Sequence, residues 1–116
     1  TASAEQLLEA QYADRAHLRS IFDALIDAAV QLGDVTIQVR KTYVSLLTPR
    51  RTFARLQAST KTRLDVGLRL DDEAPGGRLQ PSTIHETMKV QISFTVLEQV
   101  DAEALNWLQQ AYEVNR

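Results

Sequence analysis

The residues with the clearest chemical potential are basic, and they gather in one part of the chain. Eight of the 13 Lys and Arg residues lie between positions 40 and 69, where Asp65 is the only acid. This stretch therefore carries +7, and since the whole chain carries −2, the remainder carries −9. Guanidinium and ammonium groups donate charge-assisted hydrogen bonds to phosphate and carboxylate oxygens. The pattern indicates a surface that attracts an anion.

Six of these cations are candidate anion-binding residues, because they fall on predicted turns or on outward positions of predicted strands. They are Arg50, Arg51, Arg55, Lys61, Arg63 and Arg69. At the turn 59–63, three hydroxyl groups accompany two of the cations, a combination that suits an oxyanion. Two interpretations stay open. The cations bind a nucleic acid backbone or a phosphorylated small molecule, or they are solubilising charges that pair with acids elsewhere in the chain.

Catalytic and metal-binding patterns are weaker. His85 and Glu86 have the side-chain types of a general acid and base, but a metal site needs three or more ligands, and His17 lies in a predicted helix. The chain has no cysteine, so it has no disulfide and no thiolate site. The segment 75–78 lacks the spacing of a phosphate-binding or dinucleotide-binding loop. We therefore assign no catalytic residue, no metal and no cofactor, and an enzyme is the least favoured class.

Predicted strands position most of the cations. From Leu64 to Leu70 apolar and polar residues alternate strictly, which predicts a strand with one dry face and one wet face. Residues 43–48 and 53–58 form two more strands of an antiparallel meander, and in the second Phe53 is expected to share the outward face with Arg55. Pro49 suits the turn between these two strands. Further strands are predicted at 34–40 and 89–96.

Predicted helices stand at both ends of the chain. An apolar stripe over residues 18–32 predicts an amphipathic helix that ends at Gly33. Residues 2–13 are also predicted to be helical, with Ser3 and Gln6 as a capping box, and the sequence does not decide whether the two helices are continuous. The last helix is expected to begin after Asp101 as its N-cap. A Pro- and Gly-containing loop follows Leu70.

These elements define a two-layer α+β fold. We expect a mainly antiparallel five-stranded sheet, covered on one face by the N- and C-terminal helices, in the order α-β-β-β-β-loop-β-α. The opposite, polar face is expected to meet water directly. Residues 1–13 are interpreted as a helical lead-in or linker and residues 14–116 as a single domain. The apolar residues of the lead-in either join the core of this domain or contact a neighbouring domain or a second copy of the chain: Leu7, Leu8 and Tyr12.

Several segments together resemble a bacterial domain family of unknown function. They are KTYVSLLTPRRTFARLQASTKTRLDVGLRL, then GGRL, then VDAEALNWLQQAYE, preceded by QYADRAHLRSIFDAL. The resemblance covers roughly residues 11 to 115. It implies a domain at the C-terminus of proteins that are sometimes labelled "predicted transport protein". This chain departs from the family pattern at 82–89, where members have a Thr-His-Arg strand start and His85 here lies upstream.

The functional prediction follows from the charge pattern. We expect a small domain that serves as a binding or accessory module, with a basic sheet face for an anionic ligand or nucleic acid. The alternative is a protein–protein interaction or oligomerisation domain without a ligand site. No apolar run approaches the roughly 18 residues of a membrane span and no signal peptide is visible, so we expect a cytoplasmic protein without a membrane partner.

Overall fold

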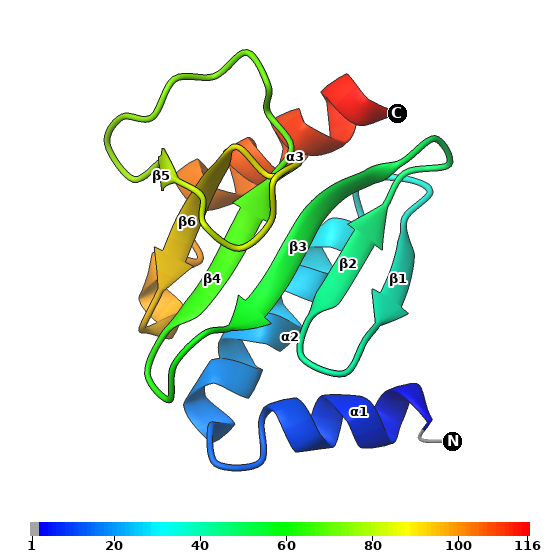
Figure 1. The fold of residues 1–116 in the computed structure, drawn as a ribbon, viewed down its shortest axis with the longest axis vertical. Helices are drawn as coiled ribbons and strands as arrows, with labels where there is room; N and C mark the ends of the chain where they lie inside the picture. The colour runs from blue at the N-terminus through cyan, green and yellow to red at the C-terminus, as the bar shows by residue number, and fades with distance from the viewer. Residues whose placement is uncertain (1–2) are drawn as a thin grey trace.

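The structure, a computed structural model, describes residues 3–116. Within these residues, three α-helices and a six-stranded antiparallel sheet form two layers (Figure 1). The helices are α1 (Ala4–Gln11), α2 (Ala16–Val30) and α3 (Ala102–Asn115), and a 3-10 turn, η1, spans Leu97–Gln99. The strands are β1 (Thr36–Val39), β2 (Val44–Leu47), β3 (Thr52–Ala58), β4 (Leu64–Leu68), β5 (Gln80–Pro81) and β6 (Val90–Phe94). The α+β prediction is confirmed.

The sheet has the order β1-β2-β3-β4-β6-β5. Strands β2, β3 and β4 form the predicted meander, β1 pairs with β2, and β6 returns beside β4 to complete the five expected strands. The sequence analysis missed β5, in which Gln80 pairs with Gln91 and Pro81 with Val90. Two residues are too few to show an alternation, and proline is normally a sign against a strand except at a sheet edge.

The core lies between the sheet and the helices α2 and α3, which both run behind it in Figure 1. Leu64, Val66 and Leu68 of β4 are all buried, with at most 3% of each side chain exposed. Helix α2 covers them with the predicted stripe, and α3 adds Leu108 and Tyr112. The strict alternation in β4 therefore marks the dry face correctly, because a strand side chain can only point to one of the two faces.

Phe53 was expected on the outward face, and this expectation is wrong. The pairing between β2 and β3 shifts by one residue, since Leu46 lies opposite Ala54 and Leu47 opposite Thr52. Phe53 is the extra residue of this β-bulge. It is fully buried, and its ring packs edge-on against Tyr112 of α3 at a centroid distance of 5.4 Å. A bulge locally breaks the period of two, so counting alternate residues fails here.

Helix α1 is separate from α2 and lies across one end of the sheet, next to the turn between β1 and β2 (Figure 1). The predicted capping box is present: Gln6 N donates to Ser3 Oγ at 3.2 Å and Ser3 N donates to Gln6 Oε1 at 2.9 Å. Tyr12 is buried and its ring lies 5.2 Å from that of Phe22. This part of the predicted lead-in thus contributes to the domain's own core.

Asp101 caps α3 as predicted, since its carboxylate accepts a hydrogen bond from Ala104 N at 3.1 Å. Arg78 Nη1 also donates to the same carboxylate, at 2.8 Å. The Ala104 hydrogen bond, and then the interaction with Arg78, hold the pKa of Asp101 below its ordinary value. The cap therefore anchors the long loop before β5 to the start of α3.

The face of the sheet away from the helices was expected to meet water directly, and this expectation is wrong for its centre. The segment 82–89 crosses that face in front of β4 (Figure 1). A Cβ atom at Gly67 would lie 2.9 Å from Ile84 Cδ1 and 2.9 Å from Met88 Cβ, so the crossing segment packs directly on the glycine. Ser45, Asp65 and Gln91, which belong to this face, are buried.

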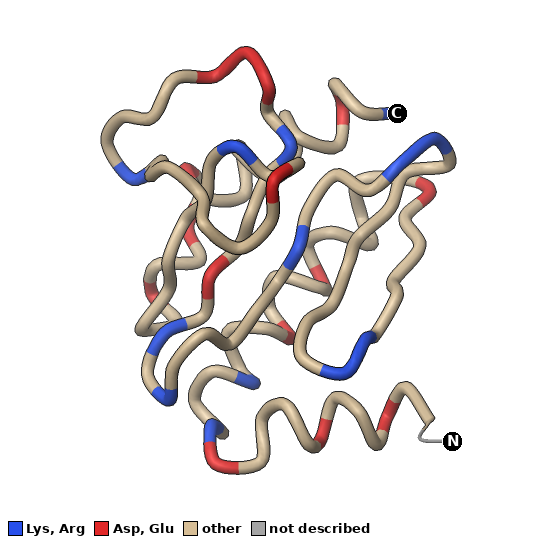
Figure 2. The backbone as a smooth tube through the Cα atoms, viewed as in Figure 1, with Lys and Arg blue, Asp and Glu red and all other residues tan. Residues whose placement is uncertain are grey.

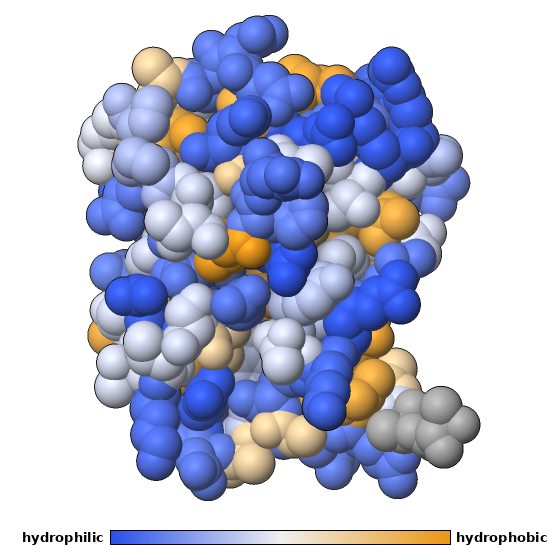
Figure 3. All heavy atoms as spheres, in the orientation of Figure 1, coloured by the Kyte–Doolittle hydropathy of each residue, from blue (hydrophilic) through white to orange (hydrophobic). Residues whose placement is uncertain are grey.

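The remainder of this surface, which we call the open face, is polar. Figure 3 shows it covered mostly by hydrophilic residues, with hydrophobic groups visible in a few places between them. Gln38 and Arg55 are half-buried on it, beside the crossing segment. The open face is therefore a polar surface that is bordered by the crossing segment.

Candidate functional site

The six predicted anion-binding residues do not gather on one surface. Arg50 and Arg51 occupy the turn between β2 and β3, and Lys61 and Arg63 the turn between β3 and β4, at opposite ends of the sheet (Figure 2). Arg55 lies in the middle of β3 and Arg69 just after β4. The charge density of the meander is thus distributed over its two ends and its centre.

Three of these cations have partners within the domain. Arg51 Nε donates to Asn115 Oδ1 at 2.7 Å. Arg63 Nε donates to Asp65 Oδ1 at 3.0 Å. Lys61 lies 4.0 Å from the carboxylate of Asp14, but both side chains are about three-quarters exposed, so this pair contributes little.

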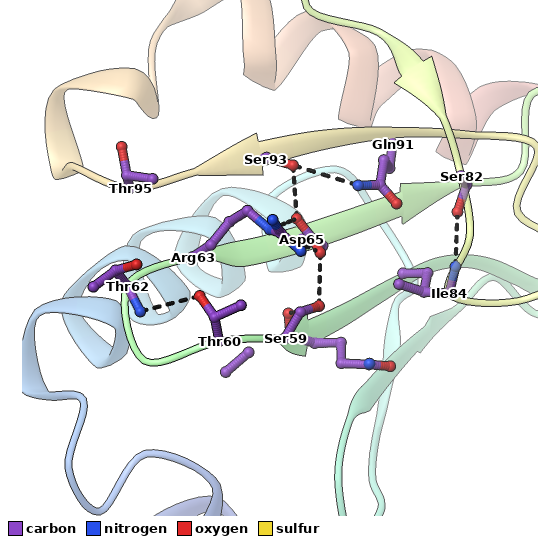
Figure 4. A network of polar contacts seen from close by, with 12 residues as sticks. Ser59, Thr60, Thr62, Arg63, Asp65, Ser82, Ile84, Gln91, Ser93 and Thr95 are labelled. Atoms are coloured by element: carbon purple, nitrogen blue, oxygen red, sulfur yellow. Dashed lines mark hydrogen bonds and ion pairs between the residues drawn. The ribbon is translucent and has the colours of Figure 1, made fainter.

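Asp65 is the centre of a compact polar network (Figure 4). Its carboxylate is nearly fully buried and accepts hydrogen bonds from Ser59 Oγ and Ser93 Oγ, both at 2.6 Å, besides the one from Arg63. These donors come from the turn after β3, from β6 and from the start of β4. A buried carboxylate needs such partners to offset its lost hydration. The network therefore fixes the turn to the sheet and directs Ser59 and Arg63 inward to Asp65.

Arg55 is in a different situation. Its guanidinium carbon lies 3.5 Å above the centre of the Tyr43 ring, a cation–π stack between neighbouring strands. Its Nε is buried without a hydrogen-bond partner in the described part of the chain. None of the ion pairs formed among residues 3–116 includes Arg55. The side chain is thus held in place by stacking while its charge has no counterion.

Arg55 lines a pocket of about 210 Å³ on the open face, which we call the Arg55 pocket. Its walls come from β1, β2, β3 and the crossing segment 82–89. They consist of Gln38, Arg40, Tyr43, Ser45, Thr52, Arg55, His85, Thr87 and Met88. The lining holds two guanidinium groups, three hydroxyl-bearing Ser and Thr residues, an imidazole and an amide, and no carboxylate. The pocket can therefore donate many hydrogen bonds and carries a net positive charge.

Helix α1 positions the strand residues of this pocket. Gln11 Nε2 donates to the carbonyl oxygens of Arg40, at 2.7 Å, and of Tyr43, at 3.3 Å. Arg40 N also donates to Tyr43 O at 2.9 Å, which closes the two-residue turn between β1 and β2. Arg40 Nη2 reaches Gln38 Oε1 at 3.0 Å. The hydrogen bonds from Gln11 of α1 therefore hold the turn that carries Arg40 and Tyr43 in place.

The crossing segment positions the other side of the pocket. Ser82 N donates to Lys89 O at 3.1 Å and Met88 N donates to His85 O at 3.1 Å, which makes the segment a compact loop. Thr87 N donates to His85 Nδ1 at 3.2 Å. A ring nitrogen that accepts a hydrogen bond carries no proton, so the neutral imidazole has its proton on Nε2. His85 thereby offers one N–H donor, at Nε2, while the Thr87 hydroxyl donates to the unprotonated Nδ1 at 2.8 Å.

A family model described as "Domain of unknown function (DUF5655)" matches residues 8–115. The chain belongs to this family. A search of the curated proteins found no match, and a search of the solved structures found none. The family assignment accords with the sequence resemblance, and its description names no activity, substrate or ligand.

Two further observations bear on which chemistry this DUF5655 domain holds. Among residues 3–116, no three His, Cys, Asp or Glu side chains come together in a way that would hold a metal ion. Over the same residues, every helix is either too short or too polar to cross a membrane. The Arg55 pocket of this family member is a polar site lined by two arginines and by no carboxylate.

Of the six predicted residues, only Arg55 lines this pocket, and the sequence analysis missed its other members. Arg40 was counted among the cations but not selected, and His85 was considered as an acid or base and as a metal ligand, but not as an anion-binding residue. A signal was available in the alternation of β1 and β2. Because the turn between these strands has two residues, alternation places Gln38, Arg40 and Ser45 on one face. The contribution of His85 had no such signal, since it depends on the path of a long loop.

Proposed function

We propose that this domain is a binding module that holds an anionic ligand in the Arg55 pocket. The observation that carries the proposal is the Arg55 guanidinium, which is stacked on Tyr43 and has no counterion among the described residues. A half-buried cation without a partner is unfavourable, because it has lost part of its hydration without gaining a compensating interaction. A bound anion would supply that interaction.

The stacking also prepares Arg55 for binding. Tyr43 covers one flat face of the guanidinium at 3.5 Å, so the N–H groups at its edge are the ones free to donate. Two parallel N–H groups of an arginine match two oxygens of a carboxylate or phosphate. A side chain that is already ordered loses less conformational entropy on binding. These features favour Arg55 as the anchor of the site.

The spacing of the cations favours a small anion over a nucleic acid backbone. A backbone needs a row of cations along one surface, whereas here Arg63 donates to buried Asp65 and Arg51 to Asn115. A DNA complex with about five phosphate contacts would show a slope of log K against log salt of about −4 to −5. We expect no such salt-dependent DNA binding.

The wider context is also part of the proposal. The resemblance implies a bacterial protein in which the domain follows a second small domain, so we propose that it serves as an accessory module in the cytoplasm. In such a role the module would supply its ligand to the neighbouring domain, or ligand binding to the module would change the conformation or activity of that domain. The absence of a catalytic constellation in the sequence supports binding rather than catalysis.

The proposal is tested by titrating the domain with phosphate, sulfate and acetate and comparing two variants. Arg55→Gln and Lys61→Gln each remove one positive charge, but Lys61 lies at an exposed turn far from the pocket lining. We expect Arg55→Gln to weaken binding by about tenfold or more, since a charge-assisted bidentate contact is lost, and Lys61→Gln to change it by less than about twofold. Equal effects of the two variants, or no binding of any anion, would refute the proposal.

A second candidate function is oligomerisation through α1. A groove of about 390 Å³ lies between α1 and the turn after β1, and Leu7 and Ala10 form part of its lining beside Arg15 and Lys41. Leu7 is half-buried, whereas Tyr12 is buried in the core. Light scattering at two protein concentrations tests this function. A mass that rises with concentration and falls again in Leu7→Asp would support it, and a constant monomer mass would refute it.

A further inference from the structure

The donors of the Arg55 pocket surround it from several sides. Gln38 comes from β1 and Arg40 from the turn after it, Arg55 and Thr52 come from β3, and His85 comes from the crossing segment. A carboxylate has two oxygens in one plane and is satisfied by donors on one side. A phosphoryl group has three terminal oxygens directed to three sides. The distribution of donors therefore fits a tetrahedral anion better than a planar one.

The charge of the pocket lining also favours a phosphoryl group over a carboxylate. Arg40 and Arg55 give the pocket two fixed positive charges, because guanidinium groups stay protonated. No carboxylate lines the pocket, and within residues 3–116 the side chain of Arg40 has only the amide oxygen of Gln38 as a partner. An anion with one charge would leave one guanidinium uncompensated. A phosphomonoester carries close to two negative charges above its second pKa of about 6 and would compensate both.

The size of the pocket limits how much of a ligand it can hold. Its volume of about 210 Å³ is below the roughly 300–1,000 Å³ of ordinary small-molecule sites. It corresponds to about seven water molecules at about 30 Å³ each. A terminal phosphate with a few further atoms fits this space, and the rest of the ligand would extend into solvent. A phosphodiester fits this site less well than a phosphomonoester. It carries substituents on two of its oxygens, has only one negative charge and has one fewer terminal oxygen.

His85 and Thr87 complete the site from the side opposite the strands. Because Thr87 N donates to His85 Nδ1, the neutral ring carries its proton on Nε2 and can donate to an oxyanion without being charged. The hydroxyl oxygen of Thr87 lies 2.8 Å from the same Nδ1, so the two side chains are held together. The crossing segment that carries them packs closely on the sheet because residue 67 is glycine and has no Cβ.

We infer that the Arg55 pocket binds the terminal phosphate of a phosphomonoester, with Arg55 and Arg40 compensating its two charges and His85 Nε2, held by Thr87, donating to one of its oxygens. This inference rests on the proposed function, which requires only that the pocket binds an anion. It adds the class of ligand and the residues that select it.

The test compares four sodium salts by NMR titration of the ¹⁵N-labelled domain at matched ionic strength and above the second pKa of phosphate. Methyl phosphate is a phosphomonoester, dimethyl phosphate a phosphodiester, acetate a carboxylate and sulfate a tetrahedral dianion. We expect methyl phosphate and sulfate to bind about tenfold or more tightly than the other two, since they can compensate both guanidinium groups. The amide shifts should concentrate in residues 38–45, in Arg55 and in residues 85–88.

Two variants with the same charge change sharpen the test. Arg40→Gln should weaken methyl phosphate by about tenfold and acetate by less than about threefold, because acetate needs only one guanidinium. Arg50→Gln, at the exposed turn between β2 and β3, should change neither by more than about twofold. Circular dichroism and the position of the unshifted amide peaks check that both variants fold.

The possible results separate the inference from the proposed function. If acetate or dimethyl phosphate binds as tightly as methyl phosphate, the inference is overturned while the proposed function stands. If none of the four anions binds, both are overturned. If Arg50→Gln weakens methyl phosphate as much as Arg40→Gln does, the binding is diffuse and the inference is again overturned.

Discussion

Replacing Asp65 tests how the buried centre of the polar sheet face is stabilised. The change Asp65→Ala removes the acceptor of two serine hydroxyls, each at 2.6 Å, and of Arg63 Nε at 3.0 Å. Asp65 is only 1% exposed, so water can replace its carboxylate only in part in the folded state. The change leaves Ser59 and Ser93 without their partner inside the sheet.

The expected change in the free energy of unfolding follows from these contacts. A hydrogen bond to a charged group contributes about 1.5–3 kcal/mol net, which gives about 3–6 kcal/mol for the two serines. Arg63 adds only about 0–1 kcal/mol, because its side chain is nearly half exposed and the pair is screened. Both serines are half-buried and regain part of this energy from water, and the variant also avoids burying a charge. We expect Asp65→Ala to lower the free energy of unfolding by about 2–4 kcal/mol.

Urea unfolding followed by circular dichroism and by the fluorescence of Trp107, the single tryptophan, measures this change. Asp65→Asn keeps one acceptor oxygen and should lose about half as much, and Arg63→Gln should lose less than about 1 kcal/mol. The Arg55 pocket does not include Asp65, so methyl phosphate affinity should change by less than about twofold in a folded Asp65→Asn. A loss below about 0.5 kcal/mol in Asp65→Ala would refute the reasoning, since that is the range of ordinary surface substitutions.

Three further predictions concern other parts of the fold. Gly67→Ala should lower stability by about 1–3 kcal/mol and shift the amide peaks of 84–88, because the new Cβ meets Met88 Cβ at 2.9 Å; unchanged peaks would contradict the packing. Tyr12→Phe should raise the midpoint of urea unfolding, which corresponds to a gain of about 1 kcal/mol in the free energy of unfolding. The reason is that the buried Tyr12 hydroxyl has no hydrogen-bond partner among the described residues, and burial raises its pKa above the ordinary range. A lower midpoint would contradict this. Asp101 has a lowered pKa in the folded state, so its stabilisation is present above the ordinary value of 3.8 and is lost as pH falls through the folded value. The difference in melting temperature between the wild type and Asp101→Asn should therefore shrink under acid conditions, and a difference independent of pH would contradict the cap.

Local signals in the sequence gave most of the fold. The alternation from Leu64 to Leu68 marked the buried face of β4, and Ser3 and Asp101 marked the starts of α1 and α3. Each signal depends on residues within a few positions of one another, where the backbone period or a capping hydrogen bond is decided. The same local reasoning failed at Phe53, because a β-bulge is set by the partner strand.

The candidate site was only partly predictable for the same reason. The sequence showed that the meander is rich in cations, but it did not show which of them lack an ion-pair partner among the described residues, as Arg55 and Arg69 do. Arg51 meets Asn115, which is 64 positions away in the chain, while Arg63 meets Asp65 two positions away. Only the folded sheet places Arg55 on Tyr43 without a counterion.

What the sequence determined by itself is the pattern of the chain: which faces are apolar, where helices begin, and how charge is divided between the meander and the rest. The tertiary structure alone decided that the segment 82–89 crosses the open face over Gly67 and that His85 joins Arg40 and Arg55 around one pocket. The physical reason is that periodicity and capping act within a few residues. The surroundings of a charged side chain are instead set by groups that chain folding brings together from distant positions.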